Sequence, residues 1–302
     1  MRNDFMYDVI IIGGGPAGLN AAMLLGRSRR KVIVFDNGKH RNRWAVHMNG
    51  FLGCDGMDPR EFIRIGREEV EKYGVEIQYK VIVSATHTKG HFVVNDDEGT
   101  MYKAKKLLLA TGLKDKLPEI DGIEAFYGKS VYHCQYCDGW ESRGKALAVY
   151  GRNRDGIGQA LAMKTWSSNV TLFTDGTNKI SRLDMELLQR NDVKICTDKI
   201  TGLEGTEGIL EHIILANGEK RAHQAMFFST GSSQQCDLGE QLGCEFTNKG
   251  VIKTRRQQKS NIPGLYVAGD AARDMQLVIV AAAEGAKAGV AINMELQREE
   301  RK

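Results

Sequence analysis

Two cysteines separated by two residues, Cys134 and Cys137, lie near the middle of the sequence with Asp138 directly after them. Thiols at this spacing can form and reopen a disulfide, which carries two electrons, or they can supply half of a zinc site. A structural zinc site needs a second pair of close ligands. The other cysteines are scattered singly along the chain: Cys54, Cys196, Cys236 and Cys244. This distribution favours a redox pair and no metal.

The composition is that of a globular protein large enough for two domains. The chain has 302 residues, of which 26% are charged, and no apolar run reaches the ~18 residues that a membrane span needs. The net charge of +4 is small, and no interleaving of basic and aromatic residues indicates nucleic-acid binding. The first residues enter a strand pattern without the features of a signal peptide. We therefore expect a cytoplasmic protein, in which a close cysteine pair is repeatedly oxidised and reduced rather than forming a permanent structural disulfide.

A nucleotide-binding pattern begins near the N-terminus. Residues 7–12 are apolar and β-branched, as in a buried strand, and residues 19–29 have the pattern of a helix. A glycine-rich turn lies between them, and a second strand pattern at residues 31–36 ends in Asp36. This order of strand, glycine-rich turn, helix, strand and acid is the fingerprint of a dinucleotide-binding unit.

The residues of this turn have separate physical roles. Gly13 permits the tight turn, Gly15 lets the backbone approach a pyrophosphate, and Gly18 lets the helix pack on the strand. The helix N-terminus offers unpaired N–H groups to the phosphates, and Asp36 can accept hydrogen bonds from a ribose. The turn residues expected to bind the cofactor are Gly13, Gly15, Pro16, Ala17 and Gly18.

Two later segments favour FAD as the dinucleotide. A strand pattern at residues 106–112 ends in Ala-Thr-Gly, and another at residues 261–270 ends in Gly-Asp. Both resemble segments of flavoproteins with two dinucleotide-binding domains, in which the acid corresponding to Asp270 binds the ribityl chain of FAD. The resemblance also implies a helix over residues 277–299 near the flavin ring. The further residues expected to bind FAD are Arg41, near its adenosine, Asn49, Thr111, Gly112, Gly269, Asp270 and Leu277.

The middle of the chain repeats the pattern of its beginning. A strand pattern at residues 145–150 leads into a turn from Gly151 to Gly156, which is followed by a helix pattern and a strand pattern at residues 170–173. We therefore expect an α/β fold with two Rossmann-like, three-layer dinucleotide-binding domains, the second inserted into the first.

The expected domain boundaries follow from this repeat. An FAD-binding domain is split between residues 1–113 and residues 244–302. The inserted domain, residues 114–243, is of the NAD(P)-binding type and carries the cysteine pair.

The order of these motifs resembles that of the low-molecular-weight thioredoxin reductase family of FAD- and NAD(P)-dependent disulfide oxidoreductases, over nearly the whole chain. The sequence Cys134-Gln135-Tyr136-Cys137-Asp138-Gly139 is closer to one branch, which includes thioredoxin-reductase-like proteins and the dithiol oxidases that close the disulfides of gliotoxin and holomycin. The resemblance implies that Cys137 is the sulfur nearer the flavin and that Cys134 exchanges with the substrate. It also implies that Asp138 is the general acid/base and that the protein is a homodimer.

The second glycine-rich turn departs from the family pattern. A working NAD(P)H site in this family has a glycine at the middle of the turn and a basic run after the next strand. Here Asn153 takes the middle position between Gly151 and Gly156, and Thr174-Asp175-Gly176 contains no basic pair. A side chain at position 153 crowds the place where a pyrophosphate meets the backbone. Three interpretations follow: modified binding of NADPH, binding of NADH, or a degenerate site with electrons exchanged with ferredoxin or oxygen.

Two functions are compatible with these motifs. One is an FAD-dependent reductase that passes electrons, from NADPH by resemblance, through Cys134 and Cys137 to a thioredoxin-like protein or a small-molecule disulfide. A variant of this function takes its electrons from ferredoxin. The other is a dithiol oxidase, which moves electrons from a small-molecule dithiol to oxygen.

Overall fold

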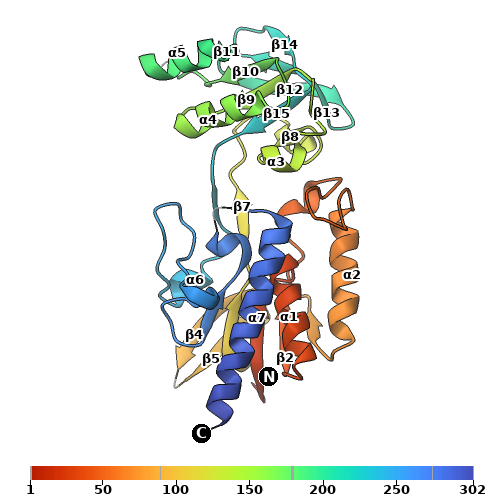
Figure 1. Cartoon of the computed structure of the whole chain (residues 1–302), viewed down its shortest axis with the longest axis vertical. Coiled ribbons are helices and arrows are strands. Elements are labelled where there is room, and N and C mark those ends of the chain that lie inside the picture. Colours follow the sequence, from red (N-terminus) through yellow and green to blue (C-terminus); the bar gives the residue numbers. More distant parts are fainter. Residues whose placement is uncertain (1, 89, 178–179, 274, 302) are drawn as a thin grey trace. The chain divides into compact units, whose positions relative to one another are not determined.

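The computed structural model describes residues 2–88, 90–177, 180–273 and 275–301. The chain divides into two compact units, each described here by itself (Figure 1). The first unit comprises Met1–Arg43, Phe51–Lys114 and Ser233–Lys302, and the second comprises Trp44–Gly50 and Asp115–Ser232. No helix within the described ranges is long and apolar enough to span a membrane.

The first unit is built on a mostly parallel sheet in the order β3-β2-β1-β6-β5-β4, with β17 pairing with the second half of β6. Its strands are β1 (Arg2–Ile12), β2 (Val32–Phe35), β3 (Glu76–Gln78), β4 (Ile82–Thr88), β5 (His91–Asp96), β6 (Met101–Leu109) and β17 (Leu265–Val267). Successive residues of β1 enter different core clusters, Val9 and Ile11 in one and Ile10 and Ile12 in the other. Since neighbouring strand residues point to opposite faces, the sheet has a hydrophobic core on both sides.

The helices of the first unit include α1 (Pro16–Arg27), which follows the glycine-rich turn directly, and α7 (Val278–Glu300), which packs against α1. The others are α2 (Pro59–Glu71) and α6 (Leu238–Gln241), with 3-10 turns η3 (Arg256–Gln258), η4 (Gly269–Ala272) and η1 (Arg41–Trp44), whose last residue belongs to the second unit. Helices α1 and α7 lie side by side (Figure 1). A Cβ atom on Gly285 would lie 1.9 Å from the carbonyl oxygen of Ala17, so the two helices pack this closely only with glycine there.

The second unit repeats the parallel arrangement, with the sheet order β11-β10-β9-β15-β8. These strands are β8 (Val131–Tyr132), β9 (Leu147–Tyr150), β10 (Val170–Phe173), β11 (Val193–Cys196) and β15 (Ala225–Phe228). The other elements are α3 (Gln135–Asp138), α4 (Arg154–Met163), α5 (Arg182–Arg190), the 3-10 turn η2 (Ile123–Ala125), and strands β12 (Ile200–Thr206), β13 (Ile209–Leu215) and β14 (Lys220–Ala222). The paired short strands β7 (Leu113–Asp115) and β16 (Ser232–Gln234) contain two of the points where the chain passes between the units. Both units therefore have the α/β, Rossmann-like character expected from the sequence.

The compact units differ from the expected domain boundaries on the C-terminal side. The sequence suggested a change of domain between residues 243 and 244, whereas the change of unit lies between Ser232 and Ser233. The physical reason is that Leu238 and Leu242 belong to the same hydrophobic cluster as Ile10 and Leu107 of the first unit. Residues 44–50 group with the second unit, which the sequence pattern did not indicate.

Candidate active site

The first glycine-rich turn is shaped by two very close backbone contacts. Gly13 has a φ of +111°, and a Cβ atom there would lie 2.2 Å from the carbonyl oxygen of Ala110 at the end of β6. A Cβ atom on Gly18 would lie 1.8 Å from the carbonyl oxygen of Gly13. Both positions therefore require glycine for the turn to form, whatever it binds.

Gly15, unlike Gly13 and Gly18, makes no close backbone contact that would exclude a Cβ atom. It is the N-cap of α1 with a φ of −79°, and in the described part of the chain no side chain caps the first turn of the helix. The nearest atom to a Cβ atom placed there would be His40 Cδ2, at 3.9 Å. The start of α1, including Pro16 at its first position, thus presents uncapped amide groups to an open space, as a pyrophosphate site requires.

Asp36, the expected ribose acceptor, is buried at the end of β2. Its carboxylate accepts hydrogen bonds from the backbone N–H of Gly38, at 2.9 Å, and from Arg67 Nη2, at 2.6 Å, and lies 3.1 Å from His40 Nε2. Burial opposes ionisation, but the hydrogen bond and charge of His40, together with Gly38 and Arg67, hold the pKa of Asp36 well below its ordinary value. Asp36 is therefore an ionised hydrogen-bond acceptor, although Gly38 and Arg67 already use part of its hydrogen-bonding capacity.

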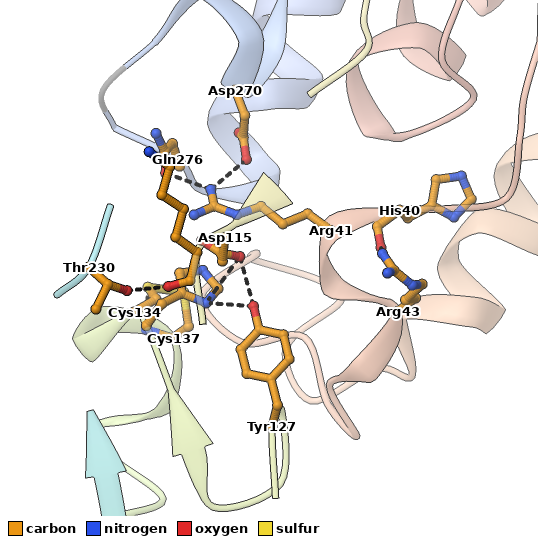
Figure 2. A network of polar contacts seen from close by, with 12 residues as sticks. His40, Arg41, Arg43, Asp115, Tyr127, Cys134, Cys137, Thr230, Asp270 and Gln276 are labelled. Carbon is orange, nitrogen blue, oxygen red and sulfur yellow. Dashed lines mark hydrogen bonds and ion pairs between the residues drawn. A yellow bond between two sulfur atoms is a disulfide. The ribbon is translucent and has the colours of Figure 1, made fainter. Parts of the chain in front are cut away.

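Arg41 lies against the acid expected at the ribityl chain, whereas the sequence suggested a place near the adenosine. Its Nη1 donates hydrogen bonds to Asp270 Oδ2, at 3.0 Å, and to Gln276 Oε1, at 2.5 Å (Figure 2). Asp270 belongs to η4, which begins at Gly269 with a φ of +76°, and a Cβ atom on Gly269 would lie 2.9 Å from the Ala17 Cβ atom. The turn of α1 and the Gly-Asp segment are therefore in contact.

The remaining expected FAD residues occupy three places. Thr111 and Gly112 follow β6, and Gly112 has a φ of +70°. Leu277 is the N-cap of α7, and its carbonyl group accepts from the N–H of Ala281 at 2.9 Å. Asn49 lies in the second unit, where its side-chain amide donates to the backbone carbonyl of Cys137 at 2.9 Å.

Cys134 and Cys137 form a disulfide, with their Cα atoms 5.3 Å apart. Cys134 is the N-cap of the short helix α3, and its sulfur accepts a hydrogen bond from the backbone N–H of Cys137 at 3.2 Å. An N–H donor of this kind stabilises a thiolate when the disulfide opens. Gly139 ends the helix, where a Cβ atom would lie 2.4 Å from the carbonyl oxygen of Gln135 and 2.7 Å from the ring of Trp166.

Asp138 has the electrostatic properties of a proton carrier at neutral pH. Burial raises its pKa to about 7, and the nearby charge of Glu141 adds to this effect. A carboxyl group with this pKa can both accept and release a proton near pH 7.

A polar cluster that the sequence motifs did not indicate adjoins the cysteine pair. The hydroxyl group of Tyr127 donates to Asp115 Oδ2 at 2.7 Å (Figure 2). His133 Nδ1 lies 3.3 Å from the same hydroxyl group. The Nδ1 atom of His133 is also 3.7 Å from Asp115 Oδ2. The cluster orients the imidazole of the residue that precedes Cys134. Asp115 and Tyr127 carry no local motif, so only the fold brings them to His133.

Comparison with known proteins assigns the chain to a family. Residues 7–285 match the pyridine nucleotide-disulphide oxidoreductase family. The chain belongs to this family. This oxidoreductase is 30% identical to the thioredoxin reductase tcpT of Claviceps purpurea, over 89% of its own length and 88% of the relative.

Two solved structures are similar to it along nearly their whole length. The structure of HlmI has a TM-score of 0.94 and 32% identity, covering 99% of this chain and 95% of that one. An oxidoreductase from Agrobacterium tumefaciens has a TM-score of 0.90 and 34% identity, covering 97% and 99% of the two chains. The oxidoreductase is thus of the thioredoxin reductase type, an FAD-dependent thiol–disulfide oxidoreductase with the Cys134–Cys137 pair at its redox centre.

The family implies FAD and a pyridine nucleotide, and the two glycine-rich turns fit these groups unequally. The first turn fits FAD, since the open space at Gly15 and the uncapped start of α1 match a pyrophosphate. In the second turn, a Cβ atom on Gly151 would lie 2.4 Å from the Cα atom of Gly156. Close packing between β9 and α4 therefore explains both of these glycines without a ligand.

Asn153 fills the position that a phosphate would take in the second turn. It is the N-cap of α4, and its Oδ1 atom accepts from the backbone N–H groups of Asp155, at 3.1 Å, and Gly156, at 3.2 Å. At the start of α1, where the N-cap is Gly15, no side chain makes such bonds. The amides that would bind a pyrophosphate are therefore satisfied by the protein itself.

Asp175, one residue after the position that corresponds to Asp36, also has its hydrogen bonds satisfied within the protein. It accepts hydrogen bonds from the hydroxyl group of Tyr150, at 2.7 Å, and the backbone N–H of Ile200, at 3.2 Å, and it pairs with Arg152. Burial opposes its ionisation, but the hydrogen bonds from Arg152 and Tyr150 hold the pKa of Asp175 below its ordinary value. The second turn of the oxidoreductase thus does not fit a pyridine nucleotide bound in the ordinary manner.

Proposed function

We propose that this oxidoreductase is a dithiol oxidase, which takes two electrons from a substrate dithiol through Cys134 and Cys137 and delivers them to molecular oxygen. The observation that carries the proposal is the capping of α4 by Asn153, which blocks the ordinary entry of electrons from a pyridine nucleotide. The disulfide, the acid beside it and the first glycine-rich turn keep the features that thiol chemistry with a flavin requires.

The proposed exchange occurs in two sulfur transfers. A substrate thiolate attacks the sulfur of Cys134, the Cys134–Cys137 bond breaks, and Cys137 leaves as a thiolate. The second substrate thiolate then attacks the substrate sulfur of the mixed disulfide and releases Cys134 as a thiolate. The substrate has lost two electrons and closed a disulfide, and the cysteine pair has gained both. The N–H of Cys137 stabilises the negative charge on Cys134.

A bound FAD would supply the two-electron carrier that links the cysteine pair to oxygen, and the overall reaction would convert dithiol and oxygen to disulfide and hydrogen peroxide. We propose that FAD binds at Gly13, Gly15, Pro16, Ala17, Gly18 and Asp36, and at the segments that contain Arg41, Thr111, Gly112, Gly269, Asp270 and Leu277. Asn49 is better explained by its hydrogen bond to the backbone carbonyl of Cys137, which holds the last turn of α3 in place.

The protons of the thiols need an acceptor close to the pair. We assign this role to Asp138, because its pKa of about 7 lets it take a proton at neutral pH and return it. His133 assists as a positioned base, supported by its contact with Tyr127 and Asp115. Both groups lie within four residues of Cys137 along the chain.

A reductase is the second candidate, supported by relatives such as tcpT that are named thioredoxin reductases. In this case a donor such as NADPH, NADH or ferredoxin reduces the protein, and Cys134 attacks the disulfide of a thioredoxin-like protein or a small molecule. We further propose that the protein is a homodimer, as the family resemblance implies, and that it acts in the cytoplasm.

Turnover under air separates the two candidates. The holoenzyme is mixed with dithiothreitol as a model dithiol, and oxygen uptake and peroxide are recorded. We expect one peroxide for each oxygen consumed, with no requirement for NADPH. An enzyme that is inactive with dithiols but turns over NADPH and a disulfide would be a reductase, and the oxidase proposal would be abandoned.

A further inference from the structure

A cavity in the first unit is lined by none of the residues expected to bind FAD. It has a volume of about 600 Å³, and its apolar lining comes from Ala286, Val290 and Ala291 of α7. Residues of η3, together with Arg255 and Arg273, also line it. Its volume lies within the range of small-molecule binding sites.

The walls of this cavity carry an excess of positive charge. Four cationic side chains line it: Arg255, Arg256, Arg273 and Lys287. The buried carboxylate of Glu284 lies 2.8 Å from Arg273 Nε and 3.8 Å from Lys287 Nζ, so it offsets part of this charge. Within the described ranges of the chain, the exposed side chains of Arg255 and Arg256 make no hydrogen bond or ion pair, so these two guanidinium groups are available to an anion.

The backbone and side chain of η3 also indicate a ligand. Gln257 and Gln258 have φ angles of 64° and 59°, a region that favours glycine, and such strain often accompanies binding sites. The side chain of Gln258 lines the cavity but is only 3% exposed, and among the residues that the structure describes its Oε1 atom has no hydrogen-bond partner. A buried acceptor without a partner is unfavourable, so a donor group on a ligand would complete this site.

We propose that this cavity binds a phosphorylated metabolite of nucleotide size. Arg255 and Arg256 bind its phosphate groups, because guanidinium groups match phosphate oxygens in charge and geometry. A hydroxyl or amino group of the ligand donates to Gln258 Oε1. The uncharged ring of the ligand packs on Ala286 and Val290. The proposal concerns residues that the dithiol chemistry does not use, so it stands independently of the direction of electron transfer.

Calorimetric titration of the FAD-loaded protein with ADP tests the proposal. We expect saturable binding with a Kd below about 1 mM. Adenosine, which lacks the phosphates, should bind at least about tenfold more weakly. The double variant Arg255→Gln/Arg256→Gln should weaken ADP binding at least about tenfold, and Gln258→Met should weaken it about threefold to tenfold.

A matched control places the same charge change elsewhere. Arg182 in α5 of the second unit has a side chain that is 91% exposed, and Arg182→Gln should leave ADP binding unchanged. Thermal unfolding verifies that each variant is folded. The proposal is overturned if ADP shows no saturable binding or if adenosine binds as tightly as ADP. It is also overturned if the double variant affects binding no more than Arg182→Gln.

Discussion

The side-chain oxygen of Asn153 lies 3.2 Å from the backbone nitrogen of Gly156 and accepts its hydrogen bond. In a nucleotide-binding turn, that amide would face a phosphate. The side-chain oxygen of Asn153 thus accepts a hydrogen bond that a phosphate group accepts in most dinucleotide-binding turns. The start of α1, with Gly15 at the same structural position, lacks such a cap.

Replacing Asn153 with glycine should reopen the second turn. Asn153→Gly frees the amides of Asp155 and Gly156, so we expect binding of NADH or NADPH to strengthen about fivefold to tenfold. The free energy of unfolding should fall by only a few tenths of a kcal/mol, because glycine is a tolerable N-cap. Anaerobic reduction of the flavin by each nucleotide measures the gain. Ser181→Gly removes the corresponding cap of α5 and is the control, since Ser181 Oγ accepts from the N–H of Asp184 at 3.1 Å. An equal response in both variants would contradict the role given to Asn153.

A methyl group at Gly15 should impair FAD binding without disturbing the fold. The nearest atom to a Cβ atom at this position would be 3.9 Å away, so Gly15→Ala fits the folded protein, but the methyl group occupies the space assigned to the pyrophosphate. We expect FAD affinity to fall at least about tenfold while the Tm of the apoprotein changes little. Flavin release on dilution measures the affinity. Gly158→Ala, where a Cβ atom would also meet open space, should retain FAD. Normal FAD affinity of Gly15→Ala would place the pyrophosphate elsewhere.

Removing the titrating group of Asp138 should flatten the pH profile of dithiol oxidation. Because the pKa of Asp138 is about 7, its carboxylate form, which accepts the thiol proton, becomes dominant above pH 7. We expect the wild-type rate to rise up to about this pH. The pH profile of Asp138→Asn should lack the inflection near pH 7, and its rate of dithiol oxidation should be at least about 100-fold lower than that of the wild type. An unchanged profile in Asp138→Asn would assign the proton to another group, with His133 the next to test.

The same pKa predicts how stability changes with pH. The pKa of Asp138 is raised from 3.8, its ordinary value, to about 7, so the folded protein holds this proton more tightly than the unfolded chain. The resulting stabilisation is complete below pH 3.8 and is lost as the pH rises through 7. The stability of Asp138→Asn should not fall in this way as the pH rises, so its free energy of unfolding at pH 8 should exceed that of the wild type by up to about 4 kcal/mol. Unfolding of both proteins at pH 5 and pH 8 measures the difference, and a constant gap between them would show that Asp138 does not titrate in this range.

The two cysteines should differ when each is replaced. In Cys137→Ser, Cys134 remains to react with a substrate disulfide but nothing can release the product, so a mixed disulfide should accumulate. Cys134→Ser should accumulate much less of it, since the exchanging sulfur is gone. Intact-protein mass spectrometry after incubation with a small-molecule disulfide measures the adduct. Equal trapping by both variants would contradict the assignment of Cys134 as the exchanging sulfur.

The parts of the site that could be predicted from the sequence are those that one segment forms alone. The turn from Gly13 to Gly18 and the Cys134–Cys137 pair depend on local spacing, so their geometry follows from the residues themselves. Crowding by Asn153 was also predictable, but its bonds to the start of α4 required the structure. Asp115 and Tyr127 were not predictable, because they reach His133 from separate segments of the chain. The extent of the two compact units was not predictable for a related reason, since residues after Ser233 join a core that is formed by the first third of the chain.

Anaerobic titration of the oxidised, FAD-loaded protein tests the central claim most directly. NADPH, NADH and dithiothreitol are added separately, and the flavin absorbance is followed in time. We expect that dithiothreitol bleaches the flavin rapidly, that neither pyridine nucleotide does so, and that admission of air restores the colour with formation of peroxide. Rapid bleaching by NADPH or NADH would contradict this expectation, because the turn capped by Asn153 would then be a working entry for electrons.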